Sequence, residues 1–262
     1  MNRLRVTTVI RRHWIVLWRS PHRWFEIAFW PVMDVVLWGS LGTFVSQQNP
    51  TSRASTPYLL AGIVLFWTFT QVQLTMATTV MEETWTRNLL NVLTTPVTPV
   101  EYIAGTAVFG LVKLALCLAT LTVTTIALYG FDLSAIGWSV LPVVAILVVN
   151  GWAIAFVIIG LILRFGQSAE ILTWGINFIV LSVSGVFFPV AALPLGLGAV
   201  AGLMPTSHAF GAARAVLDGH PVPWLSLGYG ALGTVVTLGL AVAFSTRMLT
   251  VFRSRGFVTR YS

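Results

Sequence analysis

Residues 138–163 read WSVLPVVAILVVNGWAIAFVIIGLIL and hold no aspartate, glutamate, lysine or arginine. An α-helix rises about 1.5 Å per residue, so a helix of this length crosses the roughly 30 Å hydrocarbon core of a bilayer with residues to spare. Helices of soluble proteins carry a polar face as well as an apolar one. The stretch therefore predicts a membrane-spanning helix.

Similar apolar runs recur on both sides of this stretch. Hydrophobic residues make up 56% of the 262-residue chain and charged residues only 9%, against about 25% charged residues in ordinary soluble domains. Six spans are predicted, at 25–46, 57–80, 102–129, 138–163, 171–190 and 223–247. The expected fold class is an all-α polytopic membrane protein in which residues 1–262 form a single transmembrane domain.

The formal net charge of +7 comes from basic residues at the two ends and beside the apolar runs. This placement fits anionic membrane lipid better than nucleic acid, and no nucleic-acid partner is expected. An even number of spans puts both termini on one side, together with most of the arginines, namely Arg3, Arg5, Arg11, Arg12, Arg19, Arg23, Arg87, Arg164, Arg247, Arg253, Arg255 and Arg260. Because arginine-rich loops stay in the cytoplasm, we predict a multi-pass protein of the inner (plasma) membrane with both termini cytoplasmic.

Two segments outside the predicted spans have recognisable patterns. Residues 2–23 place apolar residues on one helical stripe and arginines on the opposite face, which predicts an amphipathic helix at the membrane interface. Residues 191–222 are apolar in part but contain several prolines, which break any continuous helix. We expect this second segment to form a short re-entrant hairpin on the outer side.

The loop between the second and third predicted spans also has helical spacing. One side carries the apolar residues Trp85, Leu89, Val92 and Leu93. The other side largely carries the polar residues Glu82, Glu83, Arg87 and Asn88. The pattern predicts an amphipathic helix over 82–95, ended by Pro96. Taken alone, such a helix can simply anchor a loop at the interface.

A second group of motifs lies downstream. Residues 184–189 read SGVFFP, Leu193-Pro194 follows, and residues 204–209 read MPTSHA before Arg214. In order with Glu83, Leu89, the run Leu93-Thr94-Thr95-Pro96, Glu101 and Gly105, this set resembles the ABC-2 family of transporter permeases. The resemblance covers nearly the whole chain.

The resemblance implies a permease subunit that works as a homodimer, or as a heterodimer with a related permease, bound to two cytoplasmic ATPase subunits. Those partners would bind ATP and magnesium, and the complex would export an amphiphilic, lipid-linked or drug-like substrate. Segment 82–95 would be the coupling helix, with Glu82, Glu83, Trp85, Arg87, Leu89 and Leu93 as the ATPase-contacting residues. The chain itself has no G-x-x-x-x-G-K-[ST] motif, so it is not expected to bind ATP or to be an enzyme by itself. It also has no H-E-x-x-H ligand pair, and neither a metal nor a cofactor is expected in this chain.

Polar residues inside the predicted spans are the candidates for a substrate pathway. Spans one, two and five would line it at the dimer seam, with Thr68, Thr70, Gln71, Gln73, Thr75, Asn177, Ser182 and Ser184 as the polar candidates. The alternative role for such residues is to hydrogen-bond one helix to another.

Asp34 and Lys113 are the deepest ionisable residues of the predicted spans. Each lies about 14 Å from the cytoplasmic end of its helix, so the two could form an intramembrane charge pair, within one subunit or across the dimer. Such a pair can hold helices together, or it can couple an ion gradient to transport in a secondary transporter. A membrane subunit without a transport role is the remaining alternative.

Overall fold

The structure is a computed structural model that describes residues 1–48, 56–86, 88–132, 137–194 and 196–255. Within these residues the chain is almost entirely helical and has no strand, which confirms the all-α prediction. The helices, in chain order, are α1 (Arg3–Trp18), α2 (Pro21–Gln48), α3 (Thr56–Trp85), α4 (Leu89–Thr94), α5 (Pro99–Tyr129), α6 (Val140–Phe165), η2 (Gly166–Ala169), α7 (Glu170–Val183), η3 (Val190–Ala192), α8 (Leu197–Leu203), α9 (Pro205–Leu217) and α10 (Trp224–Arg255).

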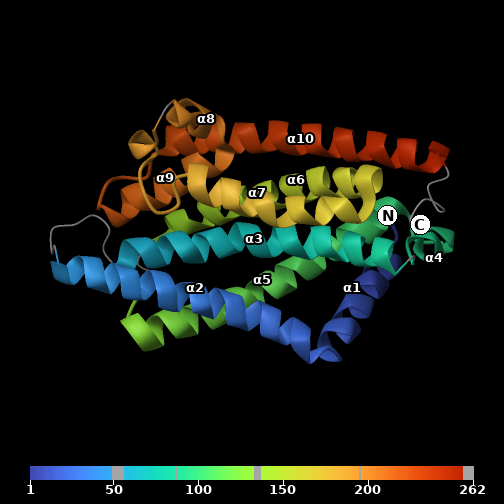
Figure 1. Cartoon of the computed structure of the whole chain (residues 1–262), viewed down its shortest axis with the longest axis horizontal. Coiled ribbons are helices and arrows are strands. Elements are labelled where there is room, and N and C mark those ends of the chain that lie inside the picture. Colours follow the sequence, from blue (N-terminus) through green and yellow to red (C-terminus); the bar gives the residue numbers. More distant parts are fainter. Residues whose placement is uncertain (49–55, 87, 133–136, 195, 256–262) are drawn as a thin grey trace.

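The long helices lie side by side in one bundle with two distinct ends (Figure 1). We call one the α4 end, where α1, α4, the start of α5 and the end of α10 gather, and the other the α8 end, which carries α8 and α9. The first helix and the last residues of α10 therefore share an end of the bundle.

Five helices are long and apolar enough to cross a membrane, at Pro21–Gln48, Thr56–Trp85, Pro99–Tyr129, Gly137–Phe165 and Trp224–Phe252. They confirm five of the six predicted spans. The predicted span 171–190 is wrong in its extent, because α7 has only 14 residues and ends at Val183. The helix stops where Gly185 adopts a positive φ of 68°, a conformation that ends helices, and Pro189 follows shortly after.

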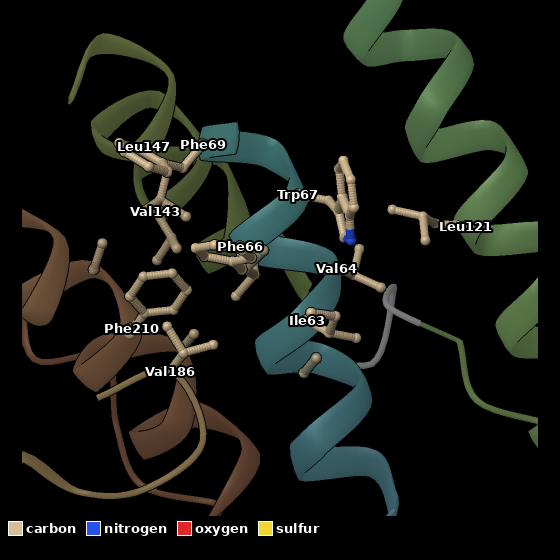
Figure 2. Close-up of a cluster of buried hydrophobic side chains, with 14 of the residues drawn as sticks. Ile63, Val64, Phe66, Trp67, Phe69, Leu121, Val143, Leu147, Val186 and Phe210 are labelled. Carbon is tan, nitrogen blue, oxygen red and sulfur yellow. The ribbon is translucent and has the colours of Figure 1, made fainter. Parts of the chain in front are cut away.

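Helix α3 is the centre of the bundle. In its most apolar 18-residue window, 94% of the residues are buried inside the structure. Figure 2 shows Phe66 and Phe69 packing toward Val143, Leu147 and Phe210, while Trp67 points toward Leu121 on the opposite side. Glycine lets a neighbouring helix approach the backbone of α3 closely. At Gly151 of α6, an added Cβ would lie 2.7 Å from the carbonyl oxygen of Phe69 on α3.

The predicted amphipathic segment 2–23 is two helices rather than one. Helix α1 ends at Trp18, and Pro21 begins α2, since proline fits the first turn of a helix but cannot continue one. The buried face of α1 is Val9, His13 and Leu17, whereas Trp18 at the end of the helix is 68% exposed. This face packs on α5.

The predicted outer segment 191–222 forms two short helices, α8 and α9, whose break falls at Met204. Pro205 begins α9, in agreement with the helix-breaking role given to the prolines. Helix α9 packs on α6 and α10, and Arg214 donates a hydrogen bond of 2.9 Å to the carbonyl oxygen of Phe188. The depth of segment 191–222 in a membrane stays a prediction.

Candidate functional site

The segment predicted as one helix over 82–95 is divided by a turn. Glu82, Glu83 and Trp85 belong to the last turn of α3, and α4 begins only at Leu89. The backbone N–H of Asn88 donates to the carbonyl oxygen of Glu83 at 2.9 Å, so the chain is drawn back toward α3 before α4 starts. Arg87 and the side chains of Leu89 and Leu93 lie outside the described residues.

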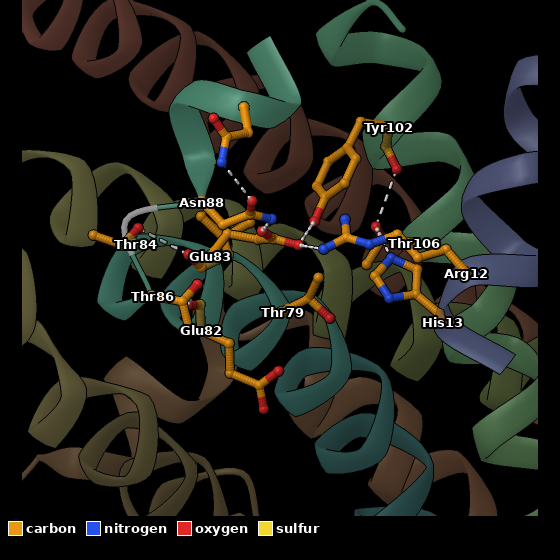
Figure 3. A network of polar contacts seen from close by, with 12 residues as sticks. Arg12, His13, Thr79, Glu82, Glu83, Thr84, Thr86, Asn88, Tyr102 and Thr106 are labelled. Atoms are coloured by element: carbon orange, nitrogen blue, oxygen red, sulfur yellow. Dashed lines mark hydrogen bonds and ion pairs between the residues drawn. The ribbon is translucent and has the colours of Figure 1, made fainter. Parts of the chain in front are cut away.

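Glu83 is the centre of the polar network at this turn (Figure 3). The residue is 6% exposed, and its carboxylate accepts hydrogen bonds from Arg12, from the Tyr102 hydroxyl at 3.2 Å and from the Asn88 amide at 2.5 Å. A buried carboxylate is stable in the charged form only when it is paired and hydrogen-bonded. Glu83 thus joins α3 to α1, to α5 and to the residue preceding α4, and it does not face outward as the amphipathic pattern predicted.

Two more carboxylates hold the N-terminal helices at the same end. Glu82 accepts from Arg23 at 2.7 Å. Glu101 accepts from Arg5 at 3.4 Å and from the backbone N–H of Asn2 at 2.7 Å. The ion pairs of Arg5 and Arg23 with these carboxylates were not predicted. The Thr98-x-x-Glu101 pattern does identify Glu101 as part of a capping box at the start of α5.

His13 fills the contact between α1 and α5. Its ring is stacked on Phe109 with centroids 5.3 Å apart, and Nε2 lies 3.3 Å from the Thr106 hydroxyl oxygen. Burial, and after it the nearby Arg12 charge, lowers the pKa of His13 to about 4. The ring is therefore neutral at neutral pH, as an apolar helix contact requires.

Helix α4 presents a polar face to solvent. Asn91 and Thr94 are exposed, and the Asn91 amide donates to the Asn88 side-chain oxygen at 3.1 Å. A hollow of about 280 Å³ lies between α4 and α1, lined among others by Thr8, Arg12 and Val92. The covalent turn and the Glu83 network connect α4 to the bundle.

The predicted pathway residues are nearly all buried within the single chain. Thr68, Thr70, Gln71, Gln73, Thr75, Asn177 and Ser184 are buried, and Ser182 is exposed. Thr68 and Thr75 donate to carbonyl oxygens of their own helix. Between helices, the Asn177 amide donates to the Gln73 side-chain oxygen at 2.9 Å, so this pair hydrogen-bonds α7 to α3.

Asp34 and Lys113, both in the described part of the chain, form no ion pair with each other. Asp34 instead accepts a hydrogen bond of 2.9 Å from the indole N–H of Trp67 on α3. The two residues therefore do not pair within one chain, and a pair across a dimer stays a prediction.

The bundle of long apolar helices is that of a multi-pass membrane protein. The model of the ABC-2 type transporter family matches residues 5–217, and the chain belongs to this family. It is thus a membrane permease of an ABC transporter, a transport subunit that is not itself catalytic, in a family that generally works with ATPase subunits. Comparison with curated proteins gives no match.

Proposed function

We propose that the chain is the permease subunit of an ATP-driven exporter, coupled through α4 to a separate pair of ATPase subunits. It moves an amphiphilic, lipid-linked or drug-like substrate outward from the cytoplasm or the inner leaflet. The observation that carries this proposal is the Glu83 network, which connects the segment carrying α4 to three helices of the bundle.

The network couples α4 to the bundle, so that a displacement of α4 moves the helices attached to it. Helix α4 follows the last turn of α3 and precedes the first turn of α5, so a displacement of α4 acts on both helices through the backbone. Asn88 adds a side-chain contact to Glu83, through which α1 follows the same displacement. Glu83 then has a positioning role, in which it holds the segment that carries α4 from within the bundle. The exposed part of α4 contacts the ATPase.

The polar layer between α3 and α7 is the proposed wall of the substrate pathway. Within the described residues, the side-chain oxygens Thr70 Oγ1, Thr173 Oγ1 and Asn177 Oδ1 are buried without a hydrogen-bond partner. Unpaired buried polar atoms cost free energy, and water or a polar substrate group that enters the layer would satisfy them. Separation of α7 from α3 in a working dimer would open this layer.

A purification tests the proposal. The full chain, isolated from its native membrane in mild detergent, should bring along an ATPase whose hydrolysis rate falls when Leu89 in α4 is replaced by glutamate. Thr250→Glu on α10 adds the same charge at an exposed position near the same end and should leave the rate unchanged. Absence of a bound ATPase, or an equal response to the two substitutions, would overturn the proposal.

A further inference from the structure

The outward side of α1 carries apolar and basic residues on the same stripe. The buried face of this helix packs on α5. The opposite side carries exposed residues at intervals of seven, four and three positions, a helical spacing, namely Leu4, Arg11, Ile15 and Trp18. We call this set the outer stripe of α1. The helix therefore presents to its surroundings a side that is neither purely apolar nor purely polar.

Two arginines on this side of α1 have charges that the described chain does not balance. The carboxylates of the surrounding turns each have a basic partner, in the pairs Glu82–Arg23, Glu83–Arg12, Glu101–Arg5 and Glu26–His22. Helix α1 itself contains no acidic residue. Arg11 of the outer stripe and Arg19 directly after the helix are exposed, and no carboxylate of the described residues pairs with either. Both can therefore bind anions from outside the chain.

Ring contacts place the end of the outer stripe at the membrane surface. Helices α1 and α2 meet at an elbow (Figure 1), where Trp18 lies edge-on to Trp24 with centroids 6.2 Å apart and stacks on Trp14 at 6.4 Å. Trp24 belongs to the first turn of α2, which is long and apolar enough to cross a membrane. Tryptophan is enriched where a span enters the bilayer, and anionic headgroups lie at the same level. A cytoplasmic protein would reach this end of the stripe only by displacing lipid.

We propose that the outer stripe of α1, together with Arg19, binds the headgroups of anionic phospholipids. Arg11 and Arg19 lie about 12 Å apart along the helix axis, which gives each arginine a headgroup of its own. Ile15 and Trp18 contact the apolar part of the same lipids. The side of α1 that carries these arginines, and not the apolar side buried on α5, is then the side that meets the membrane.

Fluorescence quenching on the full chain tests this contact. In a Cys117→Ala background, which removes the single cysteine, a bimane label is attached at Ile15→Cys. The protein is placed in phosphatidylcholine nanodiscs that contain an equal fraction of phosphatidylglycerol or phosphatidylcholine with a doxyl spin label near the headgroup. The phosphatidylglycerol should quench more strongly. Arg11→Gln or Arg19→Gln should lower this excess about fivefold, the factor for ~1 kcal/mol per basic residue near an anionic surface.

Matched controls separate this contact from general exposure to lipid. Arg164→Gln removes the same charge at an exposed position on α6 and should leave the excess unchanged. A label at Ala127→Cys, exposed near the other end of α5, should be quenched equally by the two lipids. Circular dichroism shows whether each variant is folded.

Two results would overturn the proposal. Equal quenching by the two lipids at position 15 would remove the preference for anionic headgroups. Quenching at position 15 by aqueous iodide and by neither lipid would place the outer stripe in water, where it could meet a cytoplasmic protein instead. An excess that persists in folded Arg11→Gln and Arg19→Gln would assign the lipid preference to other residues.

Discussion

Arg12 of α1 donates a hydrogen bond to the carboxylate of Glu83 in the last turn of α3, across 71 residues of sequence. The Tyr102 hydroxyl donates to the same oxygen at 3.2 Å. Because Glu83 is buried, loss of either donor leaves a desolvated carboxylate short of a partner. The N-terminal helix is thereby part of the unit that carries α4.

Glu83→Gln should destabilise the protein more than Glu82→Gln. Removing one partner of a fully buried ion pair costs about 3–5 kcal/mol. The Arg12 side chain is 42% exposed, so a smaller loss of about 1–2 kcal/mol is expected here. Glu82 is 40% exposed in its pair with Arg23, and its loss should cost less than about 1 kcal/mol. Thermal unfolding in detergent measures both, and equal shifts would contradict the central role of Glu83.

Gly105→Ala should loosen α1. An added Cβ at Gly105 would lie 2.7 Å from Val9 Cβ, so the two helices must separate, at a cost of about 1–3 kcal/mol. Limited trypsin digestion at the arginines of α1 should become about tenfold faster. Gly175→Ala on α7 is the matched control, because an added Cβ there meets no atom within 4 Å. Unchanged digestion of the Gly105 variant would show that α1 does not depend on this contact.

Acidification should weaken the docking of α1 on α5. The pKa of His13 is about 4 in the folded protein, below the ordinary value of 6.5, so the undocked helix binds a proton more readily than the docked one. The stabilisation is complete above about pH 6.5 and is lost as the pH falls toward 4, by about 2 kcal/mol at pH 5. Hydrogen exchange of α1 at pH 7.5 and 5, corrected for intrinsic rates, measures this change.

A pair of histidine variants isolates the group responsible. His13→Leu should remove the pH dependence of exchange in α1. His208→Gln should keep it, because His208 lies at the α8 end and bonds to Ser226. An unaltered pH response in His13→Leu would assign the response to another residue.

Asp34→Asn should leave ATP-driven transport nearly intact. The asparagine oxygen can still accept the Trp67 indole proton, and an ATP-driven exporter requires no titrating group at this position. Asp34→Leu leaves the indole N–H unpaired and should destabilise the protein by about 1–3 kcal/mol. Substrate transport by the reconstituted complex and thermal unfolding measure the two effects. A folded Asp34→Asn protein that no longer transports would contradict the prediction and assign a functional role to the Asp34 charge.

Hydropathy predicted five spans well because a long uncharged run specifies a membrane helix without tertiary information. It failed for 171–190, where a backbone conformation at Gly185 ends α7 inside an apolar sequence. The burial of α3 was not predictable either. Lipid and protein interior select the same apolar side chains, so hydropathy does not separate a central helix from a peripheral one.

The orientation of Glu83 differs from the one that the sequence pattern predicted, whereas the ATPase contact of this segment stays a prediction. The spacing over 82–95 placed Glu83 on an exposed face, because it assumed a continuous helix. Its partners Arg12 and Tyr102 come from distant segments and are common residues, so no local pattern marks them. Within one chain the partner of Asp34 is the uncharged indole of Trp67 rather than Lys113, and a search for opposite charges does not find such a partner.

Cross-linking from α4 is the most direct test of the claim that this helix contacts a separate ATPase. In a Cys117→Ala background, which removes the single cysteine, a photoreactive maleimide is attached at Asn91→Cys on α4 or at Leu203→Cys on α8. Both positions are exposed, and they lie at opposite ends of the bundle. The account predicts that illumination of the native membrane complex joins an ATPase subunit to the chain from position 91 and not from position 203. An intact complex in which position 91 gives no ATPase adduct would contradict it.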